Sequence, residues 1–152
     1  MINVVEFIIP MPIPWLKFGF ANIFVLLTIH FFGFKDALIV TLLRVLVSSL
    51  MVGKFLTPAF FLAMSGGIVS TVVMCAAYAL LKRYVSLIGV SVIGSYTHSV
   101  TQLLTAYIFV NHAGIFSILF VFLLVSLVTG VINGIAANYL SGIVRTVAEE
   151  NL

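Results

Sequence analysis

Arg44 is the residue whose chemistry is most costly in its surroundings. It lies near the middle of an otherwise uncharged run from Ala37 to Gly53, which is about long enough to cross a lipid bilayer. A guanidinium stays ionised and costs roughly 2.5 kcal/mol or more at the centre of the hydrocarbon. We therefore expect Arg44 to face a partner, a water-filled cavity or a ligand. The alternatives are a structural ion pair or a side chain that reaches the membrane interface.

A polar stripe on the predicted helix 87–110 is the second candidate for ligand chemistry. At helical periodicity its members share one face, and they are Ser91, Ser95, His98, Gln102 and Thr105. A membrane helix turns such a face toward other helices or a cavity. His98 and Gln102 are one turn apart, so both can contact one bound molecule. For the serines, hydrogen bonds between helices are the favoured explanation.

Amides and small residues mark the neighbouring segments. Asn22 lies on the first predicted span and Asn133 on the last, and each amide needs partners when it is buried. Asn133 stands between Gly130 and Gly134, whose spacing permits close contact between helices. Gly66-Gly67 permits the same on the third span. We expect these glycines to serve packing and the two amides to contribute to binding.

Carboxylates are scarce, which limits both ion pairs and catalysis. Glu6 is the candidate ion-pair partner of Arg44, and Lys17 is the other cation with which Glu6 could pair. Asp36 is the only aspartate, so an aspartate-rich diphosphate–magnesium site cannot form. The chain also lacks a Walker A loop and a cluster of metal ligands, and Cys75 is the single cysteine. We expect no catalytic residue, metal or cofactor, and no catalysis by this chain alone.

The amino-acid composition indicates that these residues lie on membrane-spanning helices. Hydrophobic residues make up 63% of the chain and charged residues 7%, far from the roughly 25% charged of soluble domains. No Asp, Glu, Lys or Arg lies between Arg83 and Arg145. We predict an all-α, polytopic transmembrane helical bundle formed by one domain, residues 1–152. Its net charge of +3 is spread along the chain and does not indicate nucleic-acid binding.

Five full spans are predicted, with a short apolar segment before them. The spans cover about 16–32, 37–52, 58–81 and 87–110, and the last begins near 115 and runs past 137. The preceding segment, 2–9, ends in alternating prolines at 10–14, and we expect it to be the end of a helix that is short or truncated. The basic residues flanking the spans place the loops near 35 and 82–83 and the tail at 145 in the cytoplasm, and the loops near 17 and 54 outside.

The chain resembles the Gx transporter family, often labelled heptaprenyl diphosphate synthase component I. The similar segments run in order along most of the chain, although Trp15 replaces a usual glycine and Ser99 a common asparagine. They are Pro14-Trp15-Leu16-Lys17-Phe18-Gly19-Phe20-Ala21-Asn22-Ile23, Gly33-Phe34-Lys35-Asp36-Ala37-Leu38, Leu43-Arg44-Val45, Ser65-Gly66-Gly67, Gly89-Val90-Ser91-Val92-Ile93-Gly94, and then His98 and Gln102.

That family is similar to the S components of energy-coupling factor transporters, which implies a six-helix fold in a prokaryotic cell membrane. A vitamin-like or precursor molecule would bind near the outer face, and a transmembrane T component with two ATPases would drive its uptake. Arg44 would supply a fixed positive charge, Trp15 an aromatic lid, and His98, Gln102 and Asn22 hydrogen bonds, with Lys17 and Asn133 also in the binding set. The alternatives are an accessory component of a prenyl diphosphate synthase and a membrane assembly factor without a ligand.

Overall fold

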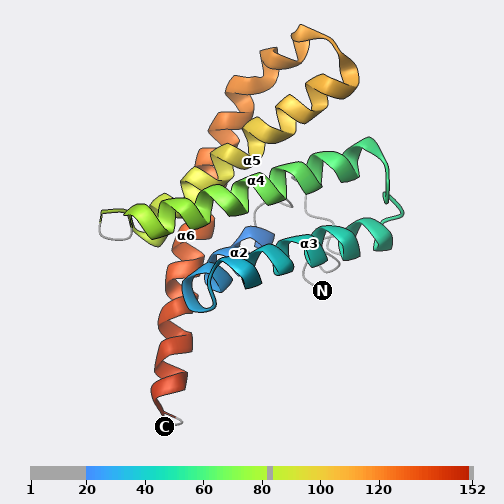
Figure 1. The fold of residues 1–152 in the computed structure, drawn as a ribbon. Coiled ribbons are helices and arrows are strands. Elements are labelled where there is room, and N and C mark those ends of the chain that lie inside the picture. The colour runs from blue at the N-terminus through green and yellow to red at the C-terminus, as the bar shows by residue number, and fades with distance from the viewer. Residues whose placement is uncertain (1–19, 82–83, 151–152) are drawn as a thin grey trace.

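The computed structural model describes residues 20–81 and 84–150, and the chain is helical through nearly all of that range (Figure 1). The predicted all-α class is therefore confirmed for the described residues. The expected helices 58–81 and 87–110 are confirmed at both ends. The elements are α2 (Phe20–Phe31), α3 (Phe34–Met51), α4 (Pro58–Leu81), α5 (Leu87–Val110), the 3-10 helix η2 (Ala113–Ile118) and α6 (Leu119–Glu150).

The turn between α2 and α3 is tighter than the sequence suggested. Gly33 adopts a φ of 94°, a conformation that glycine reaches without steric cost, and α3 begins at the next residue. The expected helix start at Ala37 is therefore wrong, because Phe34 to Asp36 already form the first turn. The Asp36 carboxylate stands at the helix N-terminus, where the helix dipole stabilises a negative charge.

The connection between α5 and α6 also differs from expectation. Asn111 ends α5 in the left-handed conformation. The Nδ1 atom of His112 then accepts a hydrogen bond from the backbone N–H of Gly114 at 3.0 Å. The chain continues as the 3-10 helix η2, and α6 begins at Leu119 rather than near Ile115. A predicted helix start is displaced here because apolar periodicity does not separate a 3-10 turn from an α-helix.

Among the described residues, two stretches are long and apolar enough to cross a membrane: Pro58–Leu81 and Ala113–Val147. The described part of α2 has 12 residues, about 18 Å of helix, against a hydrocarbon core of about 30 Å. The helices α3 and α5 have 18 and 24 residues but include the ionised Arg44 and the polar stripe. This test of length and hydropathy therefore supports two of the five predicted spans.

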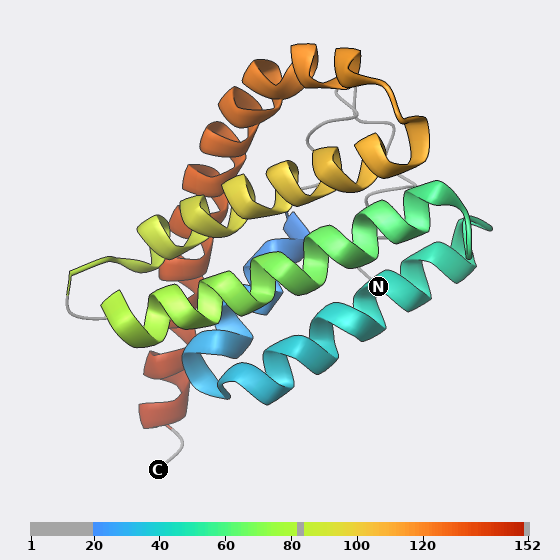
Figure 2. The same ribbon diagram turned by 45° about the horizontal axis from the view of Figure 1, so that its top comes forward.

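Helix α5 is the centre of the packing. It lies between α4 on one side and α6 on the other, while α3 packs beside α4 and α2 contacts both α3 and α6 (Figure 2). The C-terminal part of α6 extends beyond the other helices (Figure 1). The short connections make sequential helices antiparallel neighbours, as is usual in helical bundles.

Small residues let α5 and α6 approach closely, as their spacing predicted. A methyl group built on Gly134 would lie 2.5 Å from the Cα atom of Ile88, and one built on Gly130 would lie 2.8 Å from the Cα atom of Val92. Real Cβ atoms essentially never make such contacts. The two glycines therefore allow the backbones of α5 and α6 to lie in close contact.

Hydrogen bonds between hydroxyl groups connect each neighbouring pair of long helices. Thr41 of α3 bonds Thr71 of α4 at 2.8 Å, Ser65 of α4 bonds Thr105 of α5 at 2.8 Å, and Ser99 of α5 bonds Ser126 of α6 at 2.5 Å. Each bond adds a contact between two helices to hydroxyl groups that also donate to carbonyls of their own helix, as Thr41 does to Ala37 and Thr105 does to Thr101. Large apolar side chains, by contrast, are widely exposed on the outer surface.

Candidate functional site

Arg44 points into the bundle from the edge of the buried face of α3. That face consists of Ala37, Thr41, Val45 and Ser49, and Arg44 lies directly beside it and is half-buried. Its Nη1 donates a hydrogen bond to Oδ1 of Asn22 on α2 at 3.2 Å.

Gly67 of α4 provides space for this guanidinium. A methyl group built on Gly67 would lie 4.0 Å from Nη2 of Arg44 and 3.1 Å from Cγ2 of Thr41. The third span therefore contacts α3 through a small residue, as predicted. Arg44 consequently has an amide partner inside the protein and lies among α2, α3 and α4.

A cavity of about 440 Å³ lies next to this contact, between α4, α5, η2 and α6. Its size is in the lower part of the range of about 300–1,000 Å³ for small-molecule pockets. Asn22 of α2 reaches its wall. The cavity occupies the half of the bundle that bears the α5–α6 connection, since η2 contributes Ile115 and Ile118.

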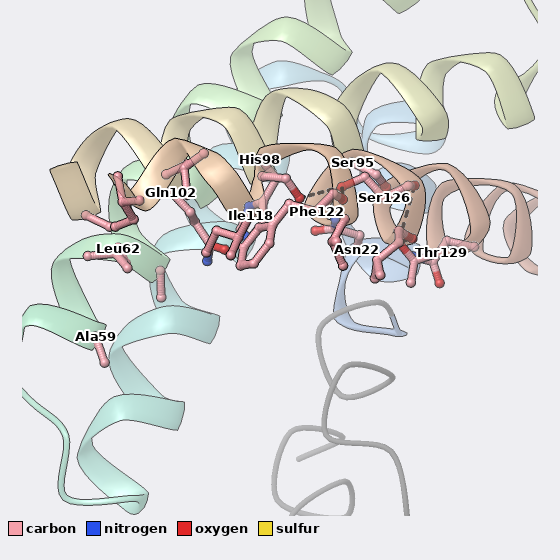
Figure 3. Close-up of a pocket in the computed structure, with 18 residues that line it drawn as sticks. Asn22, Ala59, Leu62, Ser95, His98, Gln102, Ile118, Phe122, Ser126 and Thr129 are labelled. Atoms are coloured by element: carbon pink, nitrogen blue, oxygen red, sulfur yellow. Dashed lines mark hydrogen bonds between the residues drawn. The ribbon is translucent and has the colours of Figure 1, made fainter. Parts of the chain in front are cut away.

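The wall of the cavity is polar at one end and apolar at the other (Figure 3). Asn22, Ser95, Ser126 and Thr129 gather at the polar end, and Asn133 also contributes to the lining. Toward η2 the wall is built mainly from aliphatic and aromatic side chains, among them Ala59, Leu62, Ala106, Ile118 and Phe122. The cavity therefore has the composition of an amphipathic binding site, with few polar groups in a largely apolar surface.

His98 and Gln102 lie on the wall between these two ends, one turn apart on α5. Gly66 of α4 packs directly against both side chains. A methyl group built there would lie 3.0 Å from Nδ1 of His98 and 2.9 Å from Cγ of Gln102. The Nδ1 atom of His98 is fully buried and has no hydrogen-bond partner among the described residues.

Helix α6 presents a polar stripe that the sequence interpretation missed. Ser126, Thr129 and Asn133 follow one another at intervals of three and four residues and line the cavity together. The same helical periodicity that identified the α5 stripe was present here. Asn133 is 2% exposed, and its Nδ2 has no hydrogen-bond partner among the described residues.

Two of the hydroxyl protons at the polar end, those of Ser126 and Thr129, are already used within α6. Ser126 donates to the carbonyl of Phe122 at 2.6 Å, and Thr129 donates to the carbonyl of Val125 at 2.9 Å. Because the Ser126 proton is used in this way, Ser99 is the donor in the bond that joins the two serines. These hydroxyls retain accepting lone pairs only.

The predicted binding residues fall into three groups. Asn22, His98, Gln102 and Asn133 line one cavity. Arg44 does not line it but bonds Asn22. The predictions for Trp15, Lys17 and the Glu6–Arg44 pair lie outside the described residues.

The remaining members of the α5 stripe serve helix packing. The Cβ atom of Ser91 would lie 3.2 Å from a methyl group on Gly134, and Thr105 bonds Ser65. Ser95 is the serine of the stripe that lines the cavity.

The described cavity wall offers amide, imidazole and hydroxyl groups and contains no carboxylate, lysine or arginine. Such groups donate and accept hydrogen bonds at neutral pH. The arrangement is therefore suited to holding a small molecule through a few hydrogen bonds and an apolar surface.

Comparison with known proteins gives one match. The family model described as heptaprenyl diphosphate synthase component I matches residues 1–140. No curated protein and no solved structure matches the chain.

Proposed function

The chain belongs to the heptaprenyl diphosphate synthase component I family, and we propose that it is a membrane-embedded subunit that binds a small molecule for uptake. The ligand occupies the cavity between α4, α5, η2 and α6. A separate ATP-driven module supplies the energy. The observation that carries the proposal is the cavity itself, since it collects polar side chains from three helices beside an extended apolar wall.

The distribution of apolar residues supports multi-pass insertion in the cell membrane. In the most apolar part of Ala113–Val147, 11% of residues are buried in the protein, whereas a core helix of a soluble protein is mostly buried. Phe120, Tyr139 and Ile108 are between 70% and 76% exposed. Asn22, Ser95 and other polar residues are buried instead. Contact of this apolar surface with lipid costs no free energy, whereas its contact with water is unfavourable.

Unpaired groups on the cavity wall support the presence of a ligand. A buried donor or acceptor without a partner costs about 1–3 kcal/mol. Nδ1 of His98 and Nδ2 of Asn133 are two such atoms, and both residues line the cavity. A bound molecule with complementary groups would recover part of this free energy.

The proposed energising partners follow from the resemblance to the Gx transporter family, which is similar to S components. In this proposal the chain forms one transmembrane domain of the prokaryotic cell membrane. It associates with a transmembrane T component and two ATPases, and its own role is substrate capture. No ATP-binding loop is present in its sequence, so ATP hydrolysis would take place on the partner.

The family description favours a second candidate function, as an accessory component of a heptaprenyl diphosphate synthase. With a single aspartate in the chain, the diphosphate–magnesium chemistry would belong to a partner subunit. Co-purification with a soluble synthase and a change in the length of its product would support this function. Co-purification with a T component and ATPases would instead support uptake. A ligand-free assembly factor has no use for the cavity and is the least favoured.

Binding is tested by native mass spectrometry of the protein released from its own membrane. Ala106→Phe places a benzyl group in the apolar half of the cavity, whereas Ile108→Phe makes the same kind of change on a side chain that is 76% exposed. We expect a bound small molecule on the wild type and on Ile108→Phe, and its loss from Ala106→Phe. The same small-molecule content in all three proteins would refute binding in this cavity.

A further inference from the structure

The orientation of one amide sets the chemistry of the polar end. The Oδ1 atom of Asn22 accepts a hydrogen bond from Nη1 of Arg44 at 3.2 Å. A guanidinium has donors and no acceptor, so the amide must turn its oxygen toward Arg44. The NH₂ group is then the part of Asn22 that is left for the cavity, whose wall it forms.

At this end of the cavity, the groups that lack hydrogen-bond partners are donors. Asn133 adds a second NH₂ group, which is buried and without a partner among the described residues. The protons of Ser99, Ser126 and Thr129 are used within the protein. An unpaired N–H is rarer and costlier in proteins than an oxygen that accepts one bond instead of two. The polar end therefore favours a ligand group that accepts hydrogen bonds.

We propose that the cavity takes a compact amphiphile whose polar end carries accepting oxygens, a carboxylate or a carbonyl group, held by the NH₂ groups of Asn22 and Asn133. The apolar body of the ligand extends toward η2 along Phe122, Ile118 and Leu62 (Figure 3). Arg44 is a positioning residue in this scheme. It fixes the Asn22 amide and strengthens its donor by polarisation, without contacting the ligand. The inference rests on the proposed binding function.

Two probes of the same shape test the polarity. The probes are 4-butylbenzoate, which offers accepting oxygens, and 4-butylbenzylammonium, which offers donors only. Their dissociation constants are measured by ligand-observed NMR on the protein in lipid nanodiscs, with empty nanodiscs of the same lipid as the blank. We expect the benzoate to bind about tenfold more tightly, since the ammonium leaves buried donors unpaired. Equal binding, tighter binding of the ammonium, or binding of neither probe overturns the proposal.

Asn22→Asp tests the role of the amide with almost no change in shape. The carboxylate keeps its bond to Arg44 and presents an oxygen where the NH₂ group was. We expect the preference to reverse toward the ammonium. Asn138→Asp is the matched control, because Asn138 lies on α6, is exposed and does not line the cavity. An unchanged preference in Asn22→Asp, or the same change in both variants, overturns the proposal.

Arg44→Gln provides a second variant in case Asn22→Asp fails to fold. Without the guanidinium the Asn22 amide can turn either way, so the benzoate should bind more weakly while binding of the ammonium stays level or improves. Equal weakening of both probes contradicts the positioning role. Ala106→Phe separates the two proposals. If it abolishes binding of both probes while the wild type shows no preference, the cavity binds ligands and the assigned polarity is wrong.

Discussion

The contact between α5 and α6 depends on a glycine, and this dependence can be measured. In Gly134→Ala the new methyl group would lie 2.5 Å from the Cα atom of Ile88, whereas ordinary contacts begin at 3.4 Å. The two backbones must therefore separate by about 0.9 Å. Because the opposing atom belongs to the backbone, no side-chain rotation can relieve the clash. We expect a cost near the upper end of the overpacking range, about 3 kcal/mol.

A second glycine on the same helix isolates the effect of packing. Alanine is favoured over glycine in a helix by about 1 kcal/mol, which partly offsets the clash in Gly134→Ala and leaves a net destabilisation of about 2 kcal/mol. Gly142 of α6 has no atom within 4 Å of the position of a new methyl group. Gly142→Ala should therefore be stabilised by about 1 kcal/mol.

The free energy of unfolding is measured for both variants by reversible denaturation in mixed detergent micelles. The expected difference between the variants is about 3 kcal/mol, which is the clash alone. Weaker ligand binding should accompany the loss of stability in Gly134→Ala, since Asn133 and the cavity lie at the same interface. Equal stabilities for the two variants would refute the close-packed interface.

Two further predictions concern the fold. Thr41→Val removes a buried hydrogen bond of 2.8 Å to Thr71 and should lower the free energy of unfolding by about 1 kcal/mol. The double variant with Thr71→Val should recover part of this loss. A stability of Thr41→Val equal to that of the wild type would show that the bond contributes nothing. In a Cys75→Ser background, a membrane-impermeant maleimide added to whole cells should label Lys54→Cys, and Lys35→Cys only after the membrane is opened. The reverse labelling pattern would contradict the orientation.

Local signals explain which helix ends could be predicted. Pro58 occupies the helix-opening position of α4, Ser86 caps α5 through a bond from the backbone N–H of Gly89, and Asn111 ends α5 in the left-handed conformation. These residues act on the backbone of their own segment, so the sequence reveals them. The early start of α3 depends on a one-glycine turn at Gly33, and apolar periodicity does not reveal how tight a turn is.

The candidate site was predictable where one helix carried the pattern. Periodicity placed Ser95, His98 and Gln102 on one face of α5, and the three residues line the cavity. Contacts between helices were not accessible in the same way. The bond from Arg44 to Asn22 depends on how α3 packs against α2. In our proposal Arg44 therefore orients an amide instead of contacting the ligand directly.

The most direct test of the central claim is an experimental structure of the protein extracted gently with its native lipids and any bound small molecule. We predict non-protein density inside the cavity between α4, α5, η2 and α6, with a polar group within hydrogen-bond distance of the Asn22 and Asn133 amides and an apolar body against Phe122. A cavity closed by repacked side chains, with Asn133 bonded within the protein and no additional density, would contradict the claim.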